Sequence, residues 1–536
     1  MCGIVFILNS SGHDIDEKFY NLKHRGPDSS KMLFVRNSFL GFHRLSINDT
    51  SDQGMQPFKD EHGNYLICNG EIFNYESFGI KTNSGSDCEV LLPLMESMRY
   101  YEDFGVMGDE DPEEFLNALD GDFAIVMLRN DGQVFAARDP IGVRPLYYGF
   151  DKINKSICFS SEMKSLLNIC KDIKHFPPGY YYTSKSGFKT YEPINYKIKN
   201  GCYDKNTLRQ LFTSSIEKRL LSDRPIGYFL SGGLDSSLVC ALGQKIQKNI
   251  KTFSIGFNEG HSPDLEYARK VADYIGSDHT EIKFTFEEAI DSLKQVIWHL
   301  ETYDCTTIRA SVPMFLMSKY VKENTDIKVI MSGEGADELF GGYLYFHSAP
   351  SPKDFQKETI NLLNNVHMFD SLRADRCTAS QGLELRVPFF DKSFINYVLT
   401  INPKFKHTTL EKKILRDAFK DMDLLPKEVL YRQKNGMSDA VGYSWVDKIR
   451  EFAKTIKLKY KATDFINNPP ISEEELLYRE IYTDMFGDYD ATEDIWRPKW
   501  TKEMDPSARK LQVFLPKSPI RHIHFEKKCI NLNTQY

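Results

Sequence analysis

The sequence has no long apolar run and no segment that predicts export. A membrane-spanning helix needs about 18 or more consecutive apolar residues, and no stretch of this chain of 536 residues approaches that length. The N-terminal stretch MCGIVFILNSSGHD is apolar. No basic region precedes it and no small-residue cleavage site follows it, so it does not predict a signal peptide. We therefore expect no association with a membrane.

Strong charge and paired cysteines are also missing. A net charge of −7 gives no bulk attraction to nucleic acid, and no basic face with interleaved aromatic residues is visible. The ten cysteines show no C-x-x-C pair and no metal-ligand spacing. This is typical of reduced thiols in a cytoplasmic enzyme. With 41% hydrophobic and 27% charged residues, the length predicts a soluble globular protein of about two to four domains.

One glycine-rich stretch, FLSGGLDSS at 229–237, has a specific chemistry. Apolar residues at 226–230 predict a buried strand and residues 236–247 predict a helix, so the loop between them opens a helix. Paired glycines let backbone N–H groups approach an anion, and the helix N-terminus adds its positive dipole end. For Ser-Gly-Gly alone, an ordinary turn before a capped helix would be the better interpretation. The whole pattern favours a phosphate site without the lysine of a Walker loop, and it resembles the pyrophosphatase loop of ATP pyrophosphatases.

The rest of the second half predicts alternating strands and helices. Strands are expected at 250–257 and 279–285, and a second strand with a Ser-Gly loop occurs in KVIMSGEGADELFGGY at 328–343. This alternation predicts a parallel sheet with ligands at the carboxyl ends of its strands. We expect the two Ser-Gly loops to meet around one nucleotide, with Asp235 and Asp337 as ligands of Mg²⁺. An acidic surface turn is the alternative for Glu338.

The first half contains one cysteine that differs from the others. Removal of Met1 would leave Cys2 at the N-terminus, where its own α-amine, with a pKa near 8, can accept the proton of the thiol. By position alone, a residue that starts a buried strand is the better interpretation of Cys2. Five motifs that follow in order, CGI, HRGPD, HRLSI, NGEIFN and GSDCE, change that balance.

Together these motifs resemble the class II glutamine amidotransferase domain. A tetrahedral oxyanion needs preorganised donors, which the Asn69 side chain and the Gly70 N–H can supply. Arg44 suits the α-carboxylate of glutamine and Asp87 its α-ammonium, and Glu71 joins that set. A solvated loop is a fair alternative for any single one of these charges, because most surface ions have no chemical role. For five motifs in sequence it is a poor one.

Over nearly its whole length the chain resembles the family of glutamine-hydrolysing asparagine synthetases. SGGLDSS, SPDL, ETYDCTTIRAS, SGEGADELFGGYLYFH and RVPFFDK stand where that family has its synthetase motifs. The resemblance implies an α+β N-terminal domain, an αββα sandwich of the N-terminal-nucleophile type, over residues 2–195. An α/β ATP-pyrophosphatase domain with a parallel sheet and many helices is implied for 196–536.

The resemblance also implies roles for individual residues. Cys2, Asn69, Gly70, Glu334 and Lys434 match catalytic positions, with Lys434 on the pyrophosphate side, and glutamine binding is implied for Arg44, Asn69, Gly70, Glu71 and Asp87. ATP binding is implied for Leu230, Ser231, Gly232, Gly233, Asp235, Ser236, Ser237, Ile255, Ser332 and Gly333. Thr306, Thr307 and Arg309 are predicted contacts of aspartate or pyrophosphate, with helix capping as the alternative.

The implied reaction converts ATP, aspartate and glutamine into AMP, diphosphate, asparagine and glutamate through β-aspartyl-AMP. The resemblance further implies an internal ammonia tunnel, a homodimer and a requirement for Mg²⁺. Two alternatives stay open at this point: a relative that amidates another acid or closes a β-lactam, and a catalytically dead regulatory protein. The second predicts loss of Cys2, Asp235 or Glu334, and all three are present.

Overall fold

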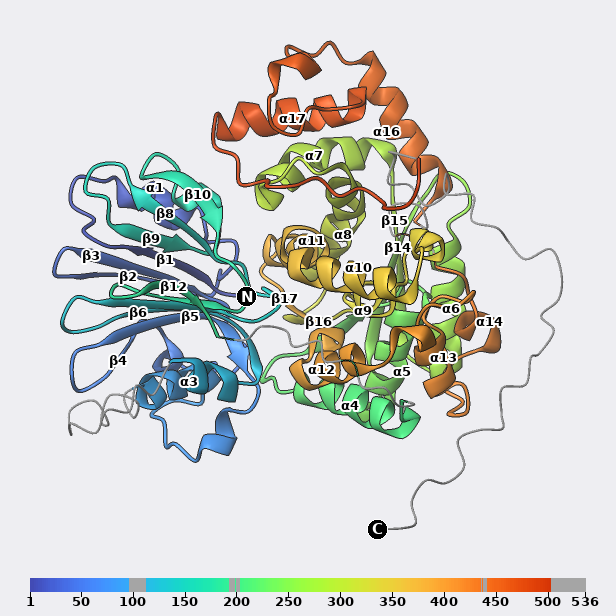
Figure 1. Cartoon of the computed structure of the whole chain (residues 1–536), viewed down its shortest axis with the longest axis horizontal. Coiled ribbons are helices and arrows are strands. Elements are labelled where there is room, and N and C mark those ends of the chain that lie inside the picture. The colour runs from blue at the N-terminus through green and yellow to red at the C-terminus, as the bar shows by residue number, and fades with distance from the viewer. Residues whose placement is uncertain (96–111, 192–197, 199–202, 435, 437–440, 503–536) are drawn as a thin grey trace.

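Two lobes lie side by side in the computed structural model, which describes residues 1–95, 112–191, 198, 203–434, 436 and 441–502 (Figure 1). The N-terminal lobe is built mainly of strands, and the second lobe is built mainly of helices around one sheet. The predicted boundary near residue 195 lies outside the described residues. Among the helices that the structure describes, none is long and apolar enough to cross a membrane.

The N-terminal lobe contains two six-stranded sheets whose neighbouring strands run antiparallel. The first has the order β10-β8-β9-β1-β3-β2 and the second β12-β11-β7-β6-β5-β4. The strands of the first sheet are β1 (Gly3–Ile7), β2 (Ser29–Val35), β3 (Ser38–Arg44), β8 (Tyr147–Asp151), β9 (Ile157–Ser160) and β10 (Cys170–His175). Those of the second are β4 (Phe58–Lys59), β5 (Tyr65–Ile72), β6 (Gly121–Leu128), β7 (Val134–Arg138), β11 (Tyr180–Thr183) and β12 (Gly187–Thr190).

Alternating side chains arrange these sheets as a four-layer sandwich. Ile4 and Phe6 of β1 pack in one core with Val126 of β6, between the sheets. Val5 and Ile7 face the other way, into a cluster with residues of α1 (Ile15–Tyr20). On the outer face of the second sheet, residues of β6 pack on α3 (Pro112–Ala118). Because successive side chains of a strand point to opposite faces, both faces of each sheet are covered, and the predicted αββα sandwich is confirmed.

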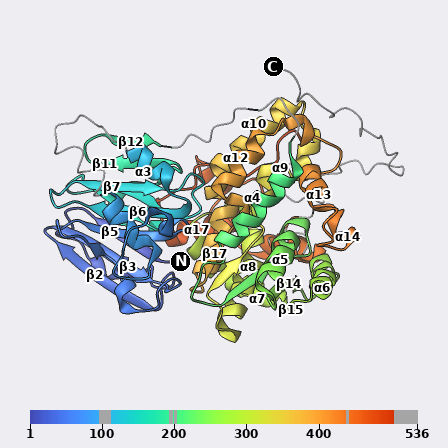
Figure 2. The same cartoon turned by 90° about the horizontal axis from the view of Figure 1, so that it is seen from below.

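The second lobe contains a five-stranded sheet of order β15-β14-β13-β16-β17, and each neighbouring pair is parallel. Its strands are β13 (Ile226–Phe229), β14 (Lys251–Phe257), β15 (Asp278–Phe284), β16 (Val329–Met331) and β17 (Glu384–Arg386). Helices lie around it (Figure 2): α4 (Lys205–Lys218), α5 (Leu234–Gln247), α6 (Pro263–Ile275), α7 (Phe286–Leu300), α8 (Cys305–Asn324), α9 (Ala336–Phe340), α10 (Pro352–Asn365), α11 (Asp370–Ala379), α12 (Lys392–Thr400), α13 (Lys413–Phe419), α14 (Lys427–Leu430), α16 (Tyr443–Thr455) and α17 (Glu473–Phe486). The predicted parallel sheet is therefore confirmed.

Helix α5 begins two residues earlier than its sequence predicts. Its first residue is Leu234 and Gly233 occupies the N-cap, whereas the sequence predicts a start at Ser236. An acidic side chain in the first turn is stabilised by the free N–H groups of a helix, and Asp235 occupies that turn. The correction moves Leu234 and Asp235 from the loop into the first turn.

The two lobes meet along a buried, charged interface. The Arg25 guanidinium donates to both carboxylate oxygens of Asp375 on α11, at 2.9 and 3.2 Å. Arg376, the next residue, pairs at 2.7 Å with Glu162 of the N-terminal lobe. The N-terminus lies at this interface beside β17 (Figure 1). The nucleophile predicted at position 2 is therefore close to the boundary between the lobes.

Candidate active sites

The first site is the loop between β13 and α5. Gly232 adopts a left-handed backbone (φ 67°), and a Cβ there would lie 2.4 Å from the backbone of Tyr267 and Ala268. Only glycine fits both constraints. The hydroxyls of Ser231 and Ser236 lie 2.9 Å apart, and the Gly233 N–H donates to Ser231 at 3.3 Å. The loop is thus a compact turn that presents N–H and O–H groups.

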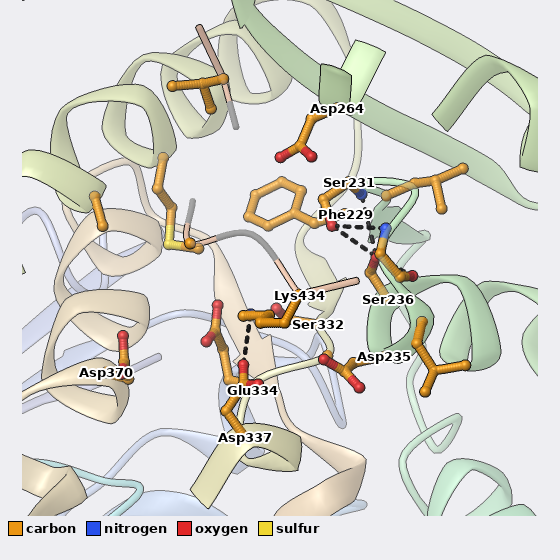
Figure 3. A pocket seen from close by; sticks show the side chains of 18 of the residues that line it. Phe229, Ser231, Asp235, Ser236, Asp264, Ser332, Glu334, Asp337, Asp370 and Lys434 are labelled. Carbon is orange, nitrogen blue, oxygen red and sulfur yellow. Dashed lines mark hydrogen bonds and ion pairs between the residues drawn. The ribbon is translucent and has the colours of Figure 1, made fainter. Parts of the chain in front are cut away.

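The loop between β16 and α9 lies directly against this first loop. A Cβ on Gly333 would be 2.6 Å from the Ser236 nitrogen, so glycine allows the two backbones to touch. Both loops line one cavity of about 190 Å³, together with Leu230 and Ile255. Figure 3 shows Ser231 and Ser236 on one side of it, with Ser332 and Lys434 toward the middle. The prediction that the two Ser-Gly loops meet is confirmed.

Two lysines hold the carboxylates of this cavity. The Lys412 ammonium pairs with Asp235 and, at 2.6 Å, with Asp337, while Lys434 pairs with Asp337 at 2.5 Å. Burial acts to raise the pKa of Asp337, but the two ammonium groups outweigh it and lower that pKa to about 2. Burial raises the pKa of Asp235. Lys412 is not among the predicted site residues, because a lysine between short helices has no motif to mark it.

The same carboxylates fit a magnesium ion. Oδ1 of Asp235 is buried and has no hydrogen-bond partner within the part of the chain that the structure describes. Magnesium is commonly held by one or two carboxylates together with substrate phosphates. Asp235 and Asp337 lie on the two loops that touch, and Lys412 bridges them. The two carboxylates are therefore suitable ligands for Mg²⁺, although the Lys412 ammonium contacts both of them in this structure.

The other side of the cavity carries an ionic cluster around Arg373 on α11. Arg373 pairs with Glu334 at 2.8 Å and with Asp370 at 2.7 Å, and the hydroxyl of Tyr343 lies 2.6 Å from Asp370. Asp370 lies across the cavity from Ser231 and Ser236 (Figure 3). Burial raises the pKa of Glu334. Arg373, Asp370 and Tyr343 were missed in the sequence because they become neighbours of Glu334 only in the folded chain.

The three predicted contact residues at the start of α8 have different surroundings in the structure. Thr306 lines the cavity. The Thr307 N–H donates to the capping carboxylate of Asp304 at 2.7 Å, and the Arg309 guanidinium donates to Glu474 of α17 at 2.7 Å. These positions fit helix capping and an internal ion pair for Thr307 and Arg309. Their predicted role toward a substrate stays a prediction.

The second site lies at the N-terminus of the other lobe. Cys2 and Ile67 pack in the core between the two sheets, and Asn69 follows Ile67 on the same face of β5 because strand side chains alternate. Cys2 and Asn69 therefore both face the space between the sheets. Both amide atoms of the Asn69 side chain are buried without a hydrogen-bond partner among the described residues. Unpaired buried amides are costly, and a bound oxyanion would give this side chain a partner.

Two buried carboxylates lie near this cysteine site. Asn48 donates to Glu71 and, at 3.4 Å, to Asp87, which also accepts the Ile72 N–H at 2.7 Å. Arg386, from β17 of the other lobe, pairs with Glu71 at 3.3 Å. Burial raises the pKa of both Glu71 and Asp87. A cationic group of a bound ligand would stabilise the ionised form of both carboxylates.

Arg44 is bonded to the backbone of its own lobe. Its guanidinium donates to the backbone carbonyls of Asp49 and Ser51 and so holds the loop after β3. Among the described residues, no hydrogen bond or ion pair joins Arg44 to Glu71 or to Asp87. The predicted contact between Arg44 and a substrate carboxylate stays a prediction.

The fold defines a class: two-domain proteins in which an αββα sandwich of the glutamine amidotransferase kind is joined to an α/β domain with a parallel sheet. A glutamine amidotransferase domain model matches residues 1–179, and an asparagine synthase model matches residues 207–355 and 348–513. The chain belongs to the asparagine synthase family.

Relatives match over almost the full length. Glutamine-hydrolyzing asparagine synthetase 2 of Arabidopsis thaliana is 40% identical over 562 residues, covering 95% of this chain and 94% of that protein. The protein with the same name in Oryza sativa subsp. japonica is 40% identical, covering 95% and 92%. A probable glutamine-hydrolyzing asparagine synthetase of Acanthamoeba polyphaga mimivirus is 38% identical, covering 96% and 100%.

Proposed function

We propose that this chain catalyses glutamine-dependent asparagine synthesis. ATP, L-aspartate, L-glutamine and water would be converted to AMP, diphosphate, L-asparagine and L-glutamate. The observation that carries the proposal is the near-full-length similarity to proteins named for this reaction. The presence of Cys2 and of the SGGLDSS loop in one chain supports it, because the reaction needs a nucleophile for glutamine and a cradle for ATP.

The synthetase cavity would bind ATP with its adenine between Leu230 and Ile255 and its phosphates on the loop Ser231–Ser237. The β-carboxylate of aspartate attacks the α-phosphorus, which forms β-aspartyl-AMP and releases diphosphate. Lys434 and Lys412, which both pair with Asp337 at this cavity, would stabilise the negative charge that the leaving group gains, and such preorganised charge lowers the barrier. Asp235 and Asp337 would hold Mg²⁺, which neutralises charge on the diphosphate when bound.

Aspartate would bind at the cluster around Arg373. A guanidinium that faces a cavity is suited to a carboxylate, because it offers paired donors. Glu334 and Asp370 now take those donors, and either can instead accept from the α-ammonium of the substrate. This proposal places the aspartate site between α11 and the loop after β16, not at Arg309.

The glutaminase site would use Cys2 after Met1 is removed. In the unprocessed chain, loss of solvent raises the pKa of the Cys2 thiol to about 11 and lowers that of the Met1 α-amine to about 6. Once Cys2 carries the free α-amine, that amine is placed to take the thiol proton. The thiolate attacks the glutamine amide, Asn69 and Gly70 stabilise the oxyanion, and Glu71 and Asp87 bind the α-ammonium. Collapse of the adduct breaks the C–N bond and releases ammonia, and water then hydrolyses the glutamyl thioester to glutamate and the free thiol.

Ammonia would then cross between the lobes inside the molecule and attack β-aspartyl-AMP. Bulk ammonia is mostly protonated at neutral pH and so is not nucleophilic, which favours an internal route. The described part of the chain holds eight cysteines, all as free thiols, and reduced thiols support a cytoplasmic location. We also propose a homodimer, on the family resemblance alone.

The test measures asparagine formed from aspartate and Mg-ATP, with glutamine or ammonium as nitrogen donor, for wild type and Cys2→Ala. We expect wild type to use both donors and the variant to use only ammonium. Loss of at least a thousandfold in glutamine-dependent rate is expected, on the order seen when a nucleophile is removed.

Failure of a folded wild-type protein to form asparagine from either donor would refute the synthetase proposal. In that case AMP release with other carboxylic acids would identify the true acceptor. Glutamine-dependent synthesis that persists in Cys2→Ala would refute the role of Cys2 alone.

A further inference from the structure

The chain beyond α17 returns across the synthetase lobe without regular secondary structure. Described residues 487–502 leave α17 and run beneath α7 as the red ribbon of Figure 1. We name residues 490–500 the return segment. It carries Trp496 and Trp500, two of the four tryptophans of the chain.

The return segment is fixed along its length by specific bonds. Asp490 accepts from the Tyr303 hydroxyl at 2.9 Å and from Arg479 at 3.0 Å. The backbone N–H of Trp496 donates to Asp304 at 2.9 Å. Farther on, Arg497 pairs with Glu475 at 2.7 Å and Lys499 pairs with Glu358. A segment held at so many points has a defined position against the lobe.

Trp496 is the residue of the return segment that lines the cavity of about 190 Å³. Its bond to Asp304 places it at the start of α8, next to Thr306, another lining residue. Its ring lies 5.8 Å from that of Tyr343 and 6.0 Å from that of Tyr345, measured between centroids. These three aromatic rings form one wall.

This wall adjoins the charged cluster and not the phosphate loop. The Tyr343 hydroxyl lies 2.6 Å from both Glu338 and Asp370, and Asp370 is paired with Arg373. The wall therefore forms the boundary of the cavity next to Arg373 and Glu334. An amino acid anchored at that cluster has the indole as its boundary.

We propose that Trp496 sets the length of the acidic amino acid that the synthetase cavity accepts. This inference rests on the proposed function, with aspartate bound at Arg373. L-Glutamate is longer than L-aspartate by one methylene, and with its α-groups and reacting carboxylate both held, that methylene must be placed against the wall. The indole is rigid and packs, partly buried, against the rings of Tyr343 and Tyr345, so moving it aside would break those contacts. A methylene in a tight pocket is worth roughly 10- to 200-fold in specificity.

The experiment measures ATP–diphosphate exchange supported by L-aspartate or by L-glutamate, for wild type, Trp496→Leu and Trp496→Ala. We expect the ratio of kcat/KM for glutamate over aspartate to rise at least tenfold in both variants. A structural effect alone would lower both rates together and leave the ratio unchanged.

Trp500→Leu is the matched control. Trp500 lies on the same segment and contacts Tyr345 and Phe346 at 6.0 and 6.1 Å, but it is not a lining residue of the cavity. We expect its ratio to equal that of wild type. A ratio in Trp496→Leu equal to that of Trp500→Leu would overturn the inference. Absence of aspartate-dependent exchange in wild type would overturn the proposed function, and this inference with it.

Discussion

At the scale of single residues, Lys412 is the side chain that joins the two loops of the synthetase cavity by ion pairs. It is nearly inaccessible to solvent, and it bridges Asp235 and Asp337, which come from different loops. Without it Asp235 would lose its ion-pair partner, and Asp337 would keep only Lys434. Removing one partner from a buried ion pair is strongly destabilising, because an uncompensated charge is left behind.

We therefore predict that Lys412→Met lowers the free energy of unfolding by about 3 kcal/mol. Urea-induced unfolding followed by fluorescence measures this change. Lys413→Met is the control, because the Lys413 side chain is 46% exposed and pairs with Asp417 one helical turn away, a contact worth less than about 1 kcal/mol. Equal losses in the two variants would contradict the proposed role of Lys412.

Elements are joined in the N-terminal lobe by buried polar contacts as well as by apolar packing. His43 of β3 stacks on Phe19 of α1, with ring centroids 3.9 Å apart. One ring nitrogen lies 2.9 Å from the Phe19 carbonyl and the other 2.7 Å from the Ser30 hydroxyl. A neutral ring satisfies both contacts, donating to the carbonyl and accepting from the hydroxyl. Burial lowers the pKa of His43 to about 4.

This shift predicts a loss of stability in acid. Between pH 6.5 and 4 the unfolded chain binds a proton at His43 that the folded chain does not, so stability falls as the pH is lowered through that window. Between pH 7 and pH 4.5 we expect this contribution to be about 2 kcal/mol. His43→Gln should reduce the difference in the free energy of unfolding between pH 7 and pH 4.5 by that amount. Urea unfolding at the two pH values measures this difference. Parallel curves for wild type and variant would argue against it.

The whole molecule depends on the interface between its lobes. Arg25 donates to the Cys2 carbonyl at 2.9 Å and to Asp375 of the other lobe, so one side chain connects the predicted nucleophile to the synthetase lobe. Both partners of the ion pair are buried. The position of Cys2 is thus coupled to the docking of the two lobes.

We predict that Asp375→Asn uncouples the two reactions. The ratio of glutamate released to asparagine formed should rise from near one to about two or more, because weaker docking lets ammonia escape. Lys218→Met removes another pair between the lobes, that of Lys218 with Asp120, whose side chains are 26% and 22% exposed. It also removes the pair of Lys218 with Asp391, which lies within the synthetase lobe and which Arg219 continues to hold. A partly solvated pair of this kind contributes little, so the ratio should not change in this control. A ratio near one in Asp375→Asn would refute the coupling.

The sequence alone determined both domain folds and which two loops line the synthetase cavity. The roles assigned to the site residues stay predictions. The resemblance carried by the five motifs implied the sandwich, strand–helix alternation predicted the parallel sheet, and the two Ser-Gly loops predicted one shared cavity. Each of these signals is local, because period, turn chemistry and motif spacing are properties of short segments.

Only the tertiary structure decided which distant residues join those motifs. Lys412, Arg373 and Trp496 reach the cavity from segments that carry no motif, and Arg386 reaches Glu71 from the other lobe. Conversely, Arg44 and Arg309 are bonded to the protein itself. A long charged side chain has many possible partners, and burial with the partner that the fold brings near selects one of them. That choice depends on the packing of the whole chain.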